Sequence, residues 1–550
     1  MVGSVGLRRL RQGSIVVLVM AMVMVVLIAR DRPVAPVQAR FSTAPSVSAG
    51  GYHSLALASD GTVWAWGDGV EGALGNGRAA GGPSFDSAAA ASLSSVPVEV
   101  VTGPNRPLGG IIMVAAGGGT PGAGIDTPKA PTNSPAPDVP EDFSLALGAN
   151  HHVYAWGDDE WGQLAQGTDD GQGTILPDGS TSSGNVVWQN CNSNLSSPPV
   201  PQPAEPCSAY AVDLAASPAG HPAIPASLGV KAIAAGWYDA LALDRAGHVW
   251  SWGANNYGQL GHGDVDPITY PDRHGQQIPV RGCWCNSTPG EVVFPDGKPL
   301  GDVVAIAAGQ WDSMALDSSG RVWVWGENHY GQLGVPPDQI EFSPYAMAMS
   351  FGDPAGGVVT EPIRAVASGW YTNYVLDAAG HVWDWGANED ARGQLDGALG
   401  NPLANTNVWD HKGDGPGASY RPYEVRSASG PLSGVIALFA GFALATTPRA
   451  ATVWGWGYNG EGELGNGSVI NTWDAGATVT ALTPDASTTI GVGVYHAVAL
   501  ARGGQILSWG RDNFGQLGTG FAVGNCTGGR QHATCADPPI IVPFPVGSAG

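Results

Sequence analysis

Seven copies of one short pattern recur along the chain, and they constrain its fold more than any other feature of the sequence. Each copy contains a Trp-Gly step, and a Gly-x-Leu turn follows that step within a few residues. The clearest copy is residues 234–261, AAGWYDALALDRAGHVWSWGANNYGQLG. Recurrence of this kind indicates a protein that stacks one small structural unit many times. The tryptophans of the seven steps are Trp66, Trp156, Trp252, Trp325, Trp385, Trp456 and Trp509.

One copy predicts a small antiparallel sheet. Apolar residues alternate in 240–243 and 249–252, and the Asp-Arg-Ala-Gly between them is typical of a hairpin connection. Another short apolar run, 230–235, precedes this hairpin, and several copies have a fourth run upstream, at 96–101, 291–294, 423–425 and 477–482. A sheet of about four strands does not bury its faces alone, so the units must pack against one another. The sequence therefore predicts an all-β protein, a seven-bladed β-propeller with long loops between blades.

The two ends of the repeat region suggest how the ring closes. No outer strand precedes the first copy at residue 47, whereas an apolar run, 540–544, follows the last copy. We expect this run to supply the missing strand of the first blade, so that both ends of the propeller lie in one sheet. The predicted organisation is residues 1–39 as a signal peptide or membrane anchor, 40–46 as a linker and 47–550 as the propeller.

The copies resemble the repeats of the regulator of chromosome condensation family. That pattern runs Ala-Cys-Gly, His-Thr-Leu-Ala-Leu, Gly-x-Val-Tyr-x-Trp-Gly and Asn-x-x-Gly-Gln-Leu-Gly, and residues 48–57, 307–316 and 508–518 match it closely. The resemblance covers nearly all of the chain from residue 47 onward and implies a propeller. Similar propellers act as a nuclear guanine-nucleotide exchange factor on chromatin, as parts of signalling proteins, and as a secreted bacterial inhibitor of β-lactamases. The resemblance is much less specific for function, because one fold hosts unrelated activities.

The N-terminal residues indicate export. Arg8, Arg9 and Arg11 precede an uncharged run, 13–29, with a strongly apolar core at 15–29. This run is short for a membrane span, which needs about 20 residues, but it suits the core of a signal peptide. The Val-Gln-Ala at 37–39 is a possible cleavage site, although two arginines separate it from the apolar run. Cleavage and retention as a membrane anchor both remain open, and either places the propeller outside the cytoplasm.

Six cysteines are few for a chain of 550 residues, but an exported protein permits them to pair. Cys191 with Cys207, and Cys526 with Cys535, each lie within one insert between copies, which makes them disulfide candidates. A bond between Cys283 and Cys285, which only Trp284 separates, would be strained. A zinc site needs four ligands at close spacing, and these pairs lie in different inserts. We expect neither a metal nor a cofactor.

The charge balance argues against nucleic acid as a partner. The chain has 24 Lys and Arg against 47 Asp and Glu, a formal net charge of -23, and no basic cluster lies outside the N-terminus. Binding to a phosphate backbone needs such a cluster. Contact with a membrane is expected only through the N-terminal segment.

Catalytic motifs are absent from the sequence. It contains no His-Glu-x-x-His, no Gly-x-Ser-x-Gly and no phosphate-binding Gly-x-x-x-x-Gly-Lys-Ser/Thr. The inserts between copies are rich in Gly, Pro, Ser, Ala and Asn, which is typical of loops, and long loops on a rigid scaffold commonly carry function. A propeller can still assemble a site from residues far apart in sequence, but we expect this protein not to be an enzyme.

One aromatic position recurs two residues after the Gly that ends the Ala-Ala-Gly run. Because the copies are related by rotation, these residues should form a ring on one face, where aromatic side chains favour ligand binding. Further packing between blades is the competing interpretation. The next residue is usually His in the family; here His53 and His496 retain it, whereas Asp239, Asp312 and Thr372 replace it. The ligand-binding candidates, with two neighbouring tryptophans, are Tyr52, Trp237, Tyr238, Trp311, Trp370, Tyr371 and Tyr495.

Three functional hypotheses follow. The first is an exported, monomeric, non-enzymatic propeller scaffold that binds a protein or a cell-surface glycan. The second is guanine-nucleotide exchange on a small GTPase, which the repeat family implies but which needs a partner inside the cell. The third is a hydrolase or lyase with a site assembled in the central channel. Export and the missing catalytic motifs favour the first.

Overall fold

The computed structural model describes most of the repeat region. The N-terminal segment 1–39 and most of the inserts lie outside the described residues. One of these inserts, residues 120–140, separates two parts of the second copy of the repeat. The chain divides into two units, Met1–Phe41 and Ser42–Gly550. None of the helical turns in the described part of the chain is long and apolar enough to cross a membrane. The described residues are 44–78, 93–119, 141–159, 161–165, 207–216, 229–263, 269–271, 277–279, 285–351, 362–388, 398–401, 418–446, 451–480, 482–485, 487–520 and 535–544.

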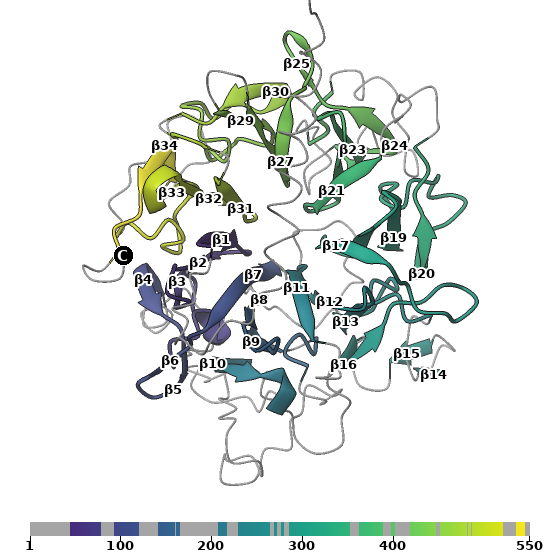
Figure 1. Ribbon diagram of the computed structural model, residues 1–550, viewed down its shortest axis with the longest axis horizontal. Coiled ribbons are helices and arrows are strands. Elements are labelled where there is room, and N and C mark those ends of the chain that lie inside the picture. The colour runs from purple at the N-terminus through teal and green to yellow at the C-terminus, as the bar shows by residue number, and fades with distance from the viewer. Residues whose placement is uncertain are drawn as a thin grey trace, which may run out of the picture. The chain divides into compact units, whose positions relative to one another are not determined.

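The described residues of the second unit form seven four-stranded antiparallel sheets, each from one copy of the repeat (Figure 1). Blades 1 to 3 contain β1 (Ser46–Ala49), β2 (His53–Leu57), β3 (Val63–Gly67) and β4 (Ser94–Glu99); β7 (Ile111–Gly119), β8 (Glu141–Gly148), β9 (Val153–Asp158) and β10 (Cys207–Asp213); and β11 (Val230–Ala235), β12 (Asp239–Asp244), β13 (Val249–Ala254) and β16 (Cys285–Glu291).

Blades 4 to 7 repeat this order. They contain β17 (Val303–Ala308), β18 (Asp312–Asp317), β19 (Val322–Glu327) and β20 (Phe342–Ala348); β21 (Ile363–Ser368), β22 (Thr372–Asp377), β23 (Val382–Ala387) and β24 (Ala418–Glu424); β27 (Val435–Phe439), β28 (Phe442–Thr446), β29 (Ala451–Gly457) and β30 (Thr472–Thr478); and β31 (Thr489–Val492), β32 (His496–Ala501), β33 (Gln505–Arg511) and β34 (Cys535–Ile541).

Short pairs of strands and turns decorate the connections. The two-stranded pairs are β5 (Val101–Gly103) with β6 (Arg106–Pro107), β14 (Thr269–Pro271) with β15 (Gln277–Pro279), and β25 (Arg426–Ser427) with β26 (Gly430–Pro431). The 3-10 turns are η1 (Val70–Gly72), η3 (Leu214–Ala216) and η5 (Arg502–Gly504).

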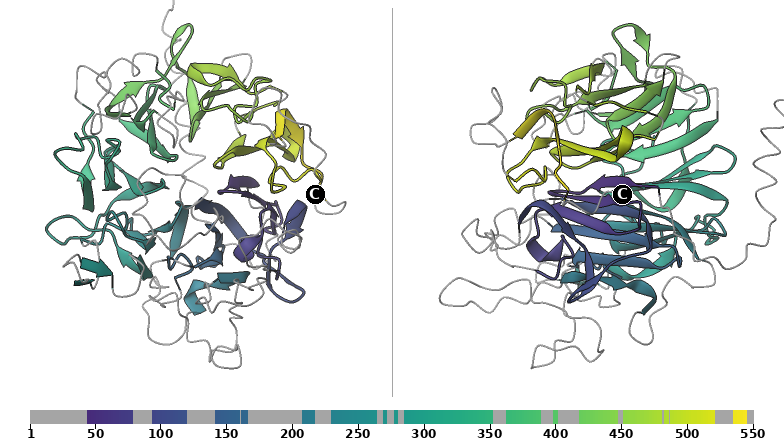
Figure 2. Two further views of the ribbon diagram at one scale, coloured as in Figure 1. Left: turned by 180° about the vertical axis from the view of Figure 1, so that it is seen from behind. Right: turned by 60° about the vertical axis from the view of Figure 1, so that its left-hand side comes forward.

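The first strands of the blades surround a common centre. They contact one another in the closed order β1, β7, β11, β17, β21, β27, β31 and back to β1. Figures 1 and 2 show this ring from opposite sides. The predicted all-β propeller of four-stranded antiparallel blades is confirmed. Because neighbouring strands are antiparallel, the turn from first to second strand and the connection from third to fourth strand lie on the same face, here called the aromatic face.

The prediction that residues 540–544 complete the first blade was wrong. β34 pairs with β33 of its own copy, and β4 pairs with β3 through Trp64 opposite Glu99. The fourth strand therefore follows the Gly-x-Leu turn of its own copy, so each blade is complete without a strand from the other end. The tail instead closes the ring through side chains: the Phe544 ring lies 6.0 Å from Trp64 and 6.1 Å from Trp66.

The Trp-Gly and Gly-x-Leu motifs interlock neighbouring blades. In six blades the buried tryptophan of the step donates its indole N–H to the carbonyl of residue x in the turn of the preceding blade. Trp66 closes the ring in this way, with 2.9 Å from Nε1 to the Gln516 oxygen of blade 7. The corresponding turn for Trp456, residues 393–396, lies outside the described residues.

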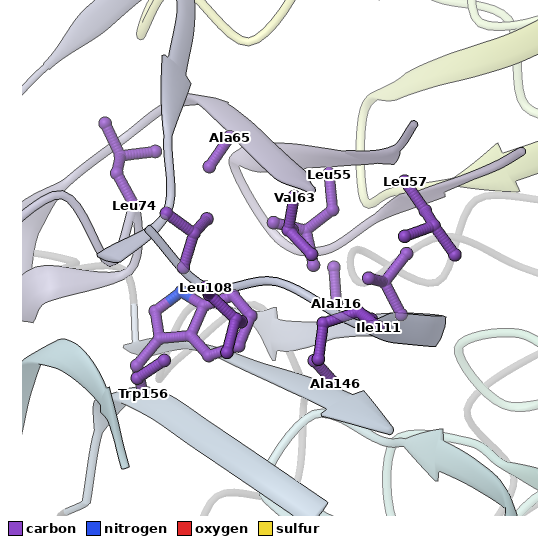
Figure 3. Close-up of a cluster of buried hydrophobic side chains, with 13 residues drawn as sticks. Leu55, Leu57, Val63, Ala65, Leu74, Leu108, Ile111, Ala116, Ala146 and Trp156 are labelled. Carbon is purple, nitrogen blue, oxygen red and sulfur yellow. The ribbon is translucent and has the colours of Figure 1, made fainter. Parts of the chain in front are cut away.

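Most of the apolar core lies between adjacent blades. Leu55 and Val63 of blade 1, Leu74 of its Gly-x-Leu turn and Trp156 of blade 2 gather in one such cluster (Figure 3). The seam between blades 7 and 1 has a cluster of its own, in which Val47 and Trp66 meet Val498 and Val542. A blade therefore buries its two faces only by packing against its neighbours in the ring, as expected from the sequence.

Candidate binding face

The structure brings the seven predicted aromatic residues together on the aromatic face. Ring centroids lie 5.3 Å apart for Trp237 and Trp370, and 6.1 Å apart for Trp370 and Tyr495. Tyr52 continues the series, 6.2 Å from Tyr495. Tyr238 and Trp311 are 4.6 Å apart, and Trp237 joins this pair. These residues come from blades 1, 3, 4, 5 and 7, so only the ring arrangement makes them neighbours.

Burial divides this set into two groups. Tyr52, Trp237, Tyr238, Trp311 and Tyr371 are buried, which agrees with a packing role. Trp370 and Tyr495 are only half-buried. Most of the predicted aromatic residues therefore contribute to packing between blades. Of the seven, only Trp370 and Tyr495 are accessible to a partner.

A second aromatic set was missed in the sequence. The residue before the Gly of the Gly-x-Leu turn is aromatic in four copies: Trp161, Tyr257, Tyr330 and Phe514. Each contacts the predicted aromatic residue of the next blade, with centroid distances of 5.7 Å from Trp161 to Tyr238, 5.7 Å from Tyr257 to Trp311, 4.8 Å from Tyr330 to Tyr371 and 4.8 Å from Phe514 to Tyr52. Their recurrence at one position of the repeat was the available signal.

The turn that carries the aromatic residue depends on its first glycine. A Cβ at Gly50 would lie 2.6 Å from the His53 ring, and one at Gly236 would lie 2.5 Å from Asp239 Oδ1. The side chain three residues later thus folds over the glycine. This close approach, rather than a left-handed backbone, explains the Gly of the Ala-Ala-Gly run.

In four of the five copies the polar residue after the aromatic position links neighbouring blades, whereas Thr372 donates to the Ala387 carbonyl of its own blade. His496 Nε2 lies 2.9 Å from Ser54 Oγ, and His53 Nε2 lies 2.8 Å from Ser144 Oγ. Asn373 donates its side-chain N–H to Asp312 Oδ2 at 2.7 Å. Acid and histidine thus serve the same structural purpose at this position, which explains why they replace each other between copies.

One of these links has the composition of a catalytic triad. His53 Nε2 contacts Ser144, and His53 Nδ1 lies 3.2 Å from Asp142 Oδ2, although the latter contact is not aligned as a hydrogen bond. All three side chains are fully buried, so no substrate carbonyl reaches the serine oxygen. The His496–Ser54 contact repeats the same geometry without the acid, which indicates a contact between blades rather than a nucleophile.

Burial shifts the pKa of several groups in this layer. It raises the pKa of Asp312 to about 7, and nearby Glu327 acts in the same direction. It also raises the pKa of Asp239 well above its usual value, with a contribution from Asp312. For His496, burial and then His53 lower the pKa to about 3. Burial thus disfavours the charged forms of Asp239, Asp312 and His496. Among the described residues, no group of His, Cys, Asp or Glu is arranged to hold a metal ion.

Blade 6 interrupts the ring of turns. Six residues separate the paired Ala307 and Met314 of blade 4, whereas only two separate the equivalent pair, Phe439 and Phe442. Blade 6 therefore has neither the aromatic nor the polar turn position. The contact between Trp370 and Tyr495 spans this interruption, since one belongs to blade 5 and the other to blade 7.

The described cysteines are oxidised. Cys207, Cys285 and Cys535 are disulfide-bonded, and no cysteine in the described part of the chain is free. Cys191 and Cys526 lie outside the described residues. The proposed pairs Cys191–Cys207 and Cys526–Cys535 therefore remain predictions.

Comparison with known proteins agrees with this architecture. Two models described as the regulator of chromosome condensation (RCC1) repeat match the chain, one at residues 60–120, 246–316 and 319–376, the other at 46–73, 230–259, 303–332 and 488–516. The match to the crystal structure of human WBSCR16 covers 88% of this chain and 94% of the WBSCR16 chain, with a TM-score of 0.53 and 18% identity. That identity supports a shared fold alone.

The proteins with sequences similar to this chain have different names and descriptions. The ultraviolet-B receptor UVR8 of Arabidopsis thaliana is 23% identical over 488 residues, which are 87% of this chain and 79% of UVR8. The mitochondrial RCC1 domain-containing protein RUG3 of the same plant is 28% identical over 284 residues, 52% of this chain and 54% of RUG3. The matched part thus spans about half of RUG3. The human E3 ubiquitin-protein ligase HERC2 matches over only 5% of its length. The matched residues of the chain thus carry the regulator of chromosome condensation (RCC1) repeat.

Proposed function

We propose that the chain is an exported, non-enzymatic propeller that binds a partner protein through its aromatic face. The observation that carries this proposal is the half-buried group of Trp370, Tyr495 and Arg511 on that face. The Arg511 guanidinium lies 5.1 Å from the centre of the Tyr495 ring. Trp, Tyr and Arg are the residue types that dominate protein interfaces, and here a rigid ring of blades holds them in place.

A protein fits this face better than a glycan does. Sugar rings stack on open aromatic faces, whereas the rings here pack mainly against one another, and most are buried. Half-buried rings next to an arginine instead suit a partner side chain that is desolvated on binding.

Two features support export. The N-terminal sequence has the charge and apolar core of a signal segment, and the described cysteines form disulfides, which persist in oxidising compartments. Nucleotide exchange on a cytoplasmic GTPase has no comparable support, since no residue of this chain argues for it independently of the repeats.

Trp370→Ala is expected to weaken capture of the partner about tenfold or more, because it removes a central contact. The partner is first crosslinked to the purified exported protein on the cell surface and identified. The affinity of that partner for the unmodified protein and for each variant is then measured. Trp323→Ala is the matched control, since Trp323 is also half-buried but lies in the third strand of blade 4 beside Arg321. Equal effects of both substitutions would contradict the proposal. Loss of capture after removal of cell-surface glycans would identify a glycan partner instead.

Cell fractionation with N-terminal sequencing tests export. We expect either a mature protein that starts at Arg40 or a membrane-bound protein whose propeller is accessible to protease from outside. A soluble, full-length protein in the cytosol would contradict export and would make a GTPase the first partner to seek.

A further inference from the structure

We propose that the interruption at blade 6 is the anchoring point, where one apolar side chain of a basic partner segment packs against Trp370 and Tyr495. This inference rests on the proposed function and gives it a location and a ligand chemistry. It separates the part of the aromatic face that packs the ring from the part that is available to a partner.

The interruption comes from the short first turn of blade 6. In blade 4, Trp311 and Asp312 occupy the turn, are buried and contact the neighbouring blades. In blade 6 the turn is reduced to Ala440 and Gly441, because Phe439 pairs directly with Phe442. No blade-6 side chain therefore stands where Trp311 stands in blade 4.

In the described turns between first and second strands, the half-buried aromatic side chains flank this interruption. Trp237, Tyr238, Trp311 and Tyr371, from the turns of blades 3 to 5, are buried. The half-buried residues of the turns in blades 5 to 7 are Gly369, Trp370, Ala440, Gly441, Gly493, Val494 and Tyr495, and Phe439 at the end of β27 is half-buried as well. On the connections between third and fourth strands, Trp161 and Tyr257 of blades 2 and 3 are also half-buried.

The side chains at this position are apolar. Trp370, Phe439, Val494 and Tyr495 offer rings and a β-branched chain. Arg511 adds little net charge, since its Nε lies 3.5 Å from Glu461 Oε2.

The net charge of the aromatic face favours basic residues next to the anchor. The chain carries a formal charge of -23. Within the described residues, the third-to-fourth-strand connections and the strand ends that lead into them contain two cations, Arg78 and Arg511. The carboxyl groups of the same segments are Asp68, Glu71, Asp158, Asp159, Glu327, Asp338, Glu341, Glu461, Glu463 and Asp512. Burial raises the pKa of Glu463 to about 8, whereas Glu341 and Asp338, in the connection between the third and fourth strands of blade 4, are exposed. Lysine or arginine beside the anchor complements this face.

The test fills the interruption and uses three short peptides as probes. Ala440–Gly441 is replaced by the six residues 308–313 of blade 4, a turn that the same fold already accommodates. The probes are acetyl-Lys-Trp-Lys-amide, acetyl-Lys-Ala-Lys-amide and acetyl-Asp-Trp-Asp-amide, titrated calorimetrically up to about 5 mM into the full exported protein. We expect the first probe to bind, and the other two to bind at least about fivefold more weakly. The filled turn should abolish binding while the thermal melting temperature stays unchanged.

Ala440→Trp covers the case in which the longer turn lowers the melting temperature. It fills the same position from a single half-exposed residue and should also abolish binding of the first probe. Unchanged binding in a folded, filled variant would overturn the inference, as would failure of acetyl-Lys-Trp-Lys-amide to bind the unmodified protein. If partner capture then still depended on Trp370, the proposed function would stand without this anchor. If capture were insensitive to Trp370 as well, both would fail.

Discussion

Replacing Trp66 with alanine is expected to lower the free energy of unfolding by about 3–5 kcal/mol. The side chain is fully buried between blades 1 and 7, and its Nε1 donates to the Gln516 carbonyl. The substitution leaves a large cavity at the seam where the ring closes, and it removes one of two donors to the Gln516 carbonyl, since Ser54 Oγ also donates to that oxygen at 3.1 Å. Urea denaturation of the full protein, followed by tryptophan fluorescence and by circular dichroism, measures the loss.

Two control substitutions sharpen this result. Trp64→Ala removes a half-buried ring of the same strand and should cost clearly less, about 1–2 kcal/mol. Trp325→Ala breaks the equivalent contact between blades 4 and 3, from Trp325 Nε1 to the Gln259 carbonyl. It should cost about as much as Trp66→Ala, because the closing seam uses the same interlock as the interior seams. A negligible effect at Trp66 with a large one at Trp325 would show that the seam between blades 1 and 7 contributes little to stability.

Replacing Asp312 with asparagine is expected to change how stability depends on pH. Burial raises the pKa of this carboxyl from 3.8 to about 7, so the folded protein keeps a proton that the unfolded chain releases above about pH 4. The stability of the unmodified protein therefore falls as pH rises from about 4 to 7 through this group, and the change stops above its folded pKa. Asparagine does not titrate. Between pH 5 and pH 8 the variant should gain about 2–3 kcal/mol relative to the unmodified protein.

The measurement is the difference in unfolding free energy between the two proteins at several pH values. Groups common to both, such as His496 and Asp384, largely cancel in this difference. Asp60→Asn is the control: Asp60 is exposed, and hydrogen bonds from Thr62 lower its pKa, so its curve should run parallel to that of the unmodified protein above pH 5. A constant difference for Asp312→Asn across pH 5 to 8 would mean that Asp312 is ionised in the folded protein.

The aromatic face shows what a repeat pattern in the sequence can and cannot predict. Recurrence at one position predicted that Tyr238, Trp311 and Tyr371 share a face, because rotation brings equivalent positions together. It did not predict that they are buried, since burial depends on Trp161, Tyr257 and Tyr330 arriving from the preceding blades. Nor did it show the interruption at blade 6, where the Trp-Gly step is intact and the missing residues lie in the preceding turn.

By itself, the sequence determined the unit and its repetition. Alternating apolar residues fixed the hairpins, and the seven Trp-Gly steps fixed an all-β propeller, because both are local patterns that each copy carries in full. Only the tertiary structure decided which blade owns each fourth strand and how the ring closes. The fourth strand lies between two copies and pairs over a long and variable loop, so nothing local sets its partner. The same holds for Trp370 and Tyr495, which 125 positions separate in sequence and 6.1 Å separate in the ring.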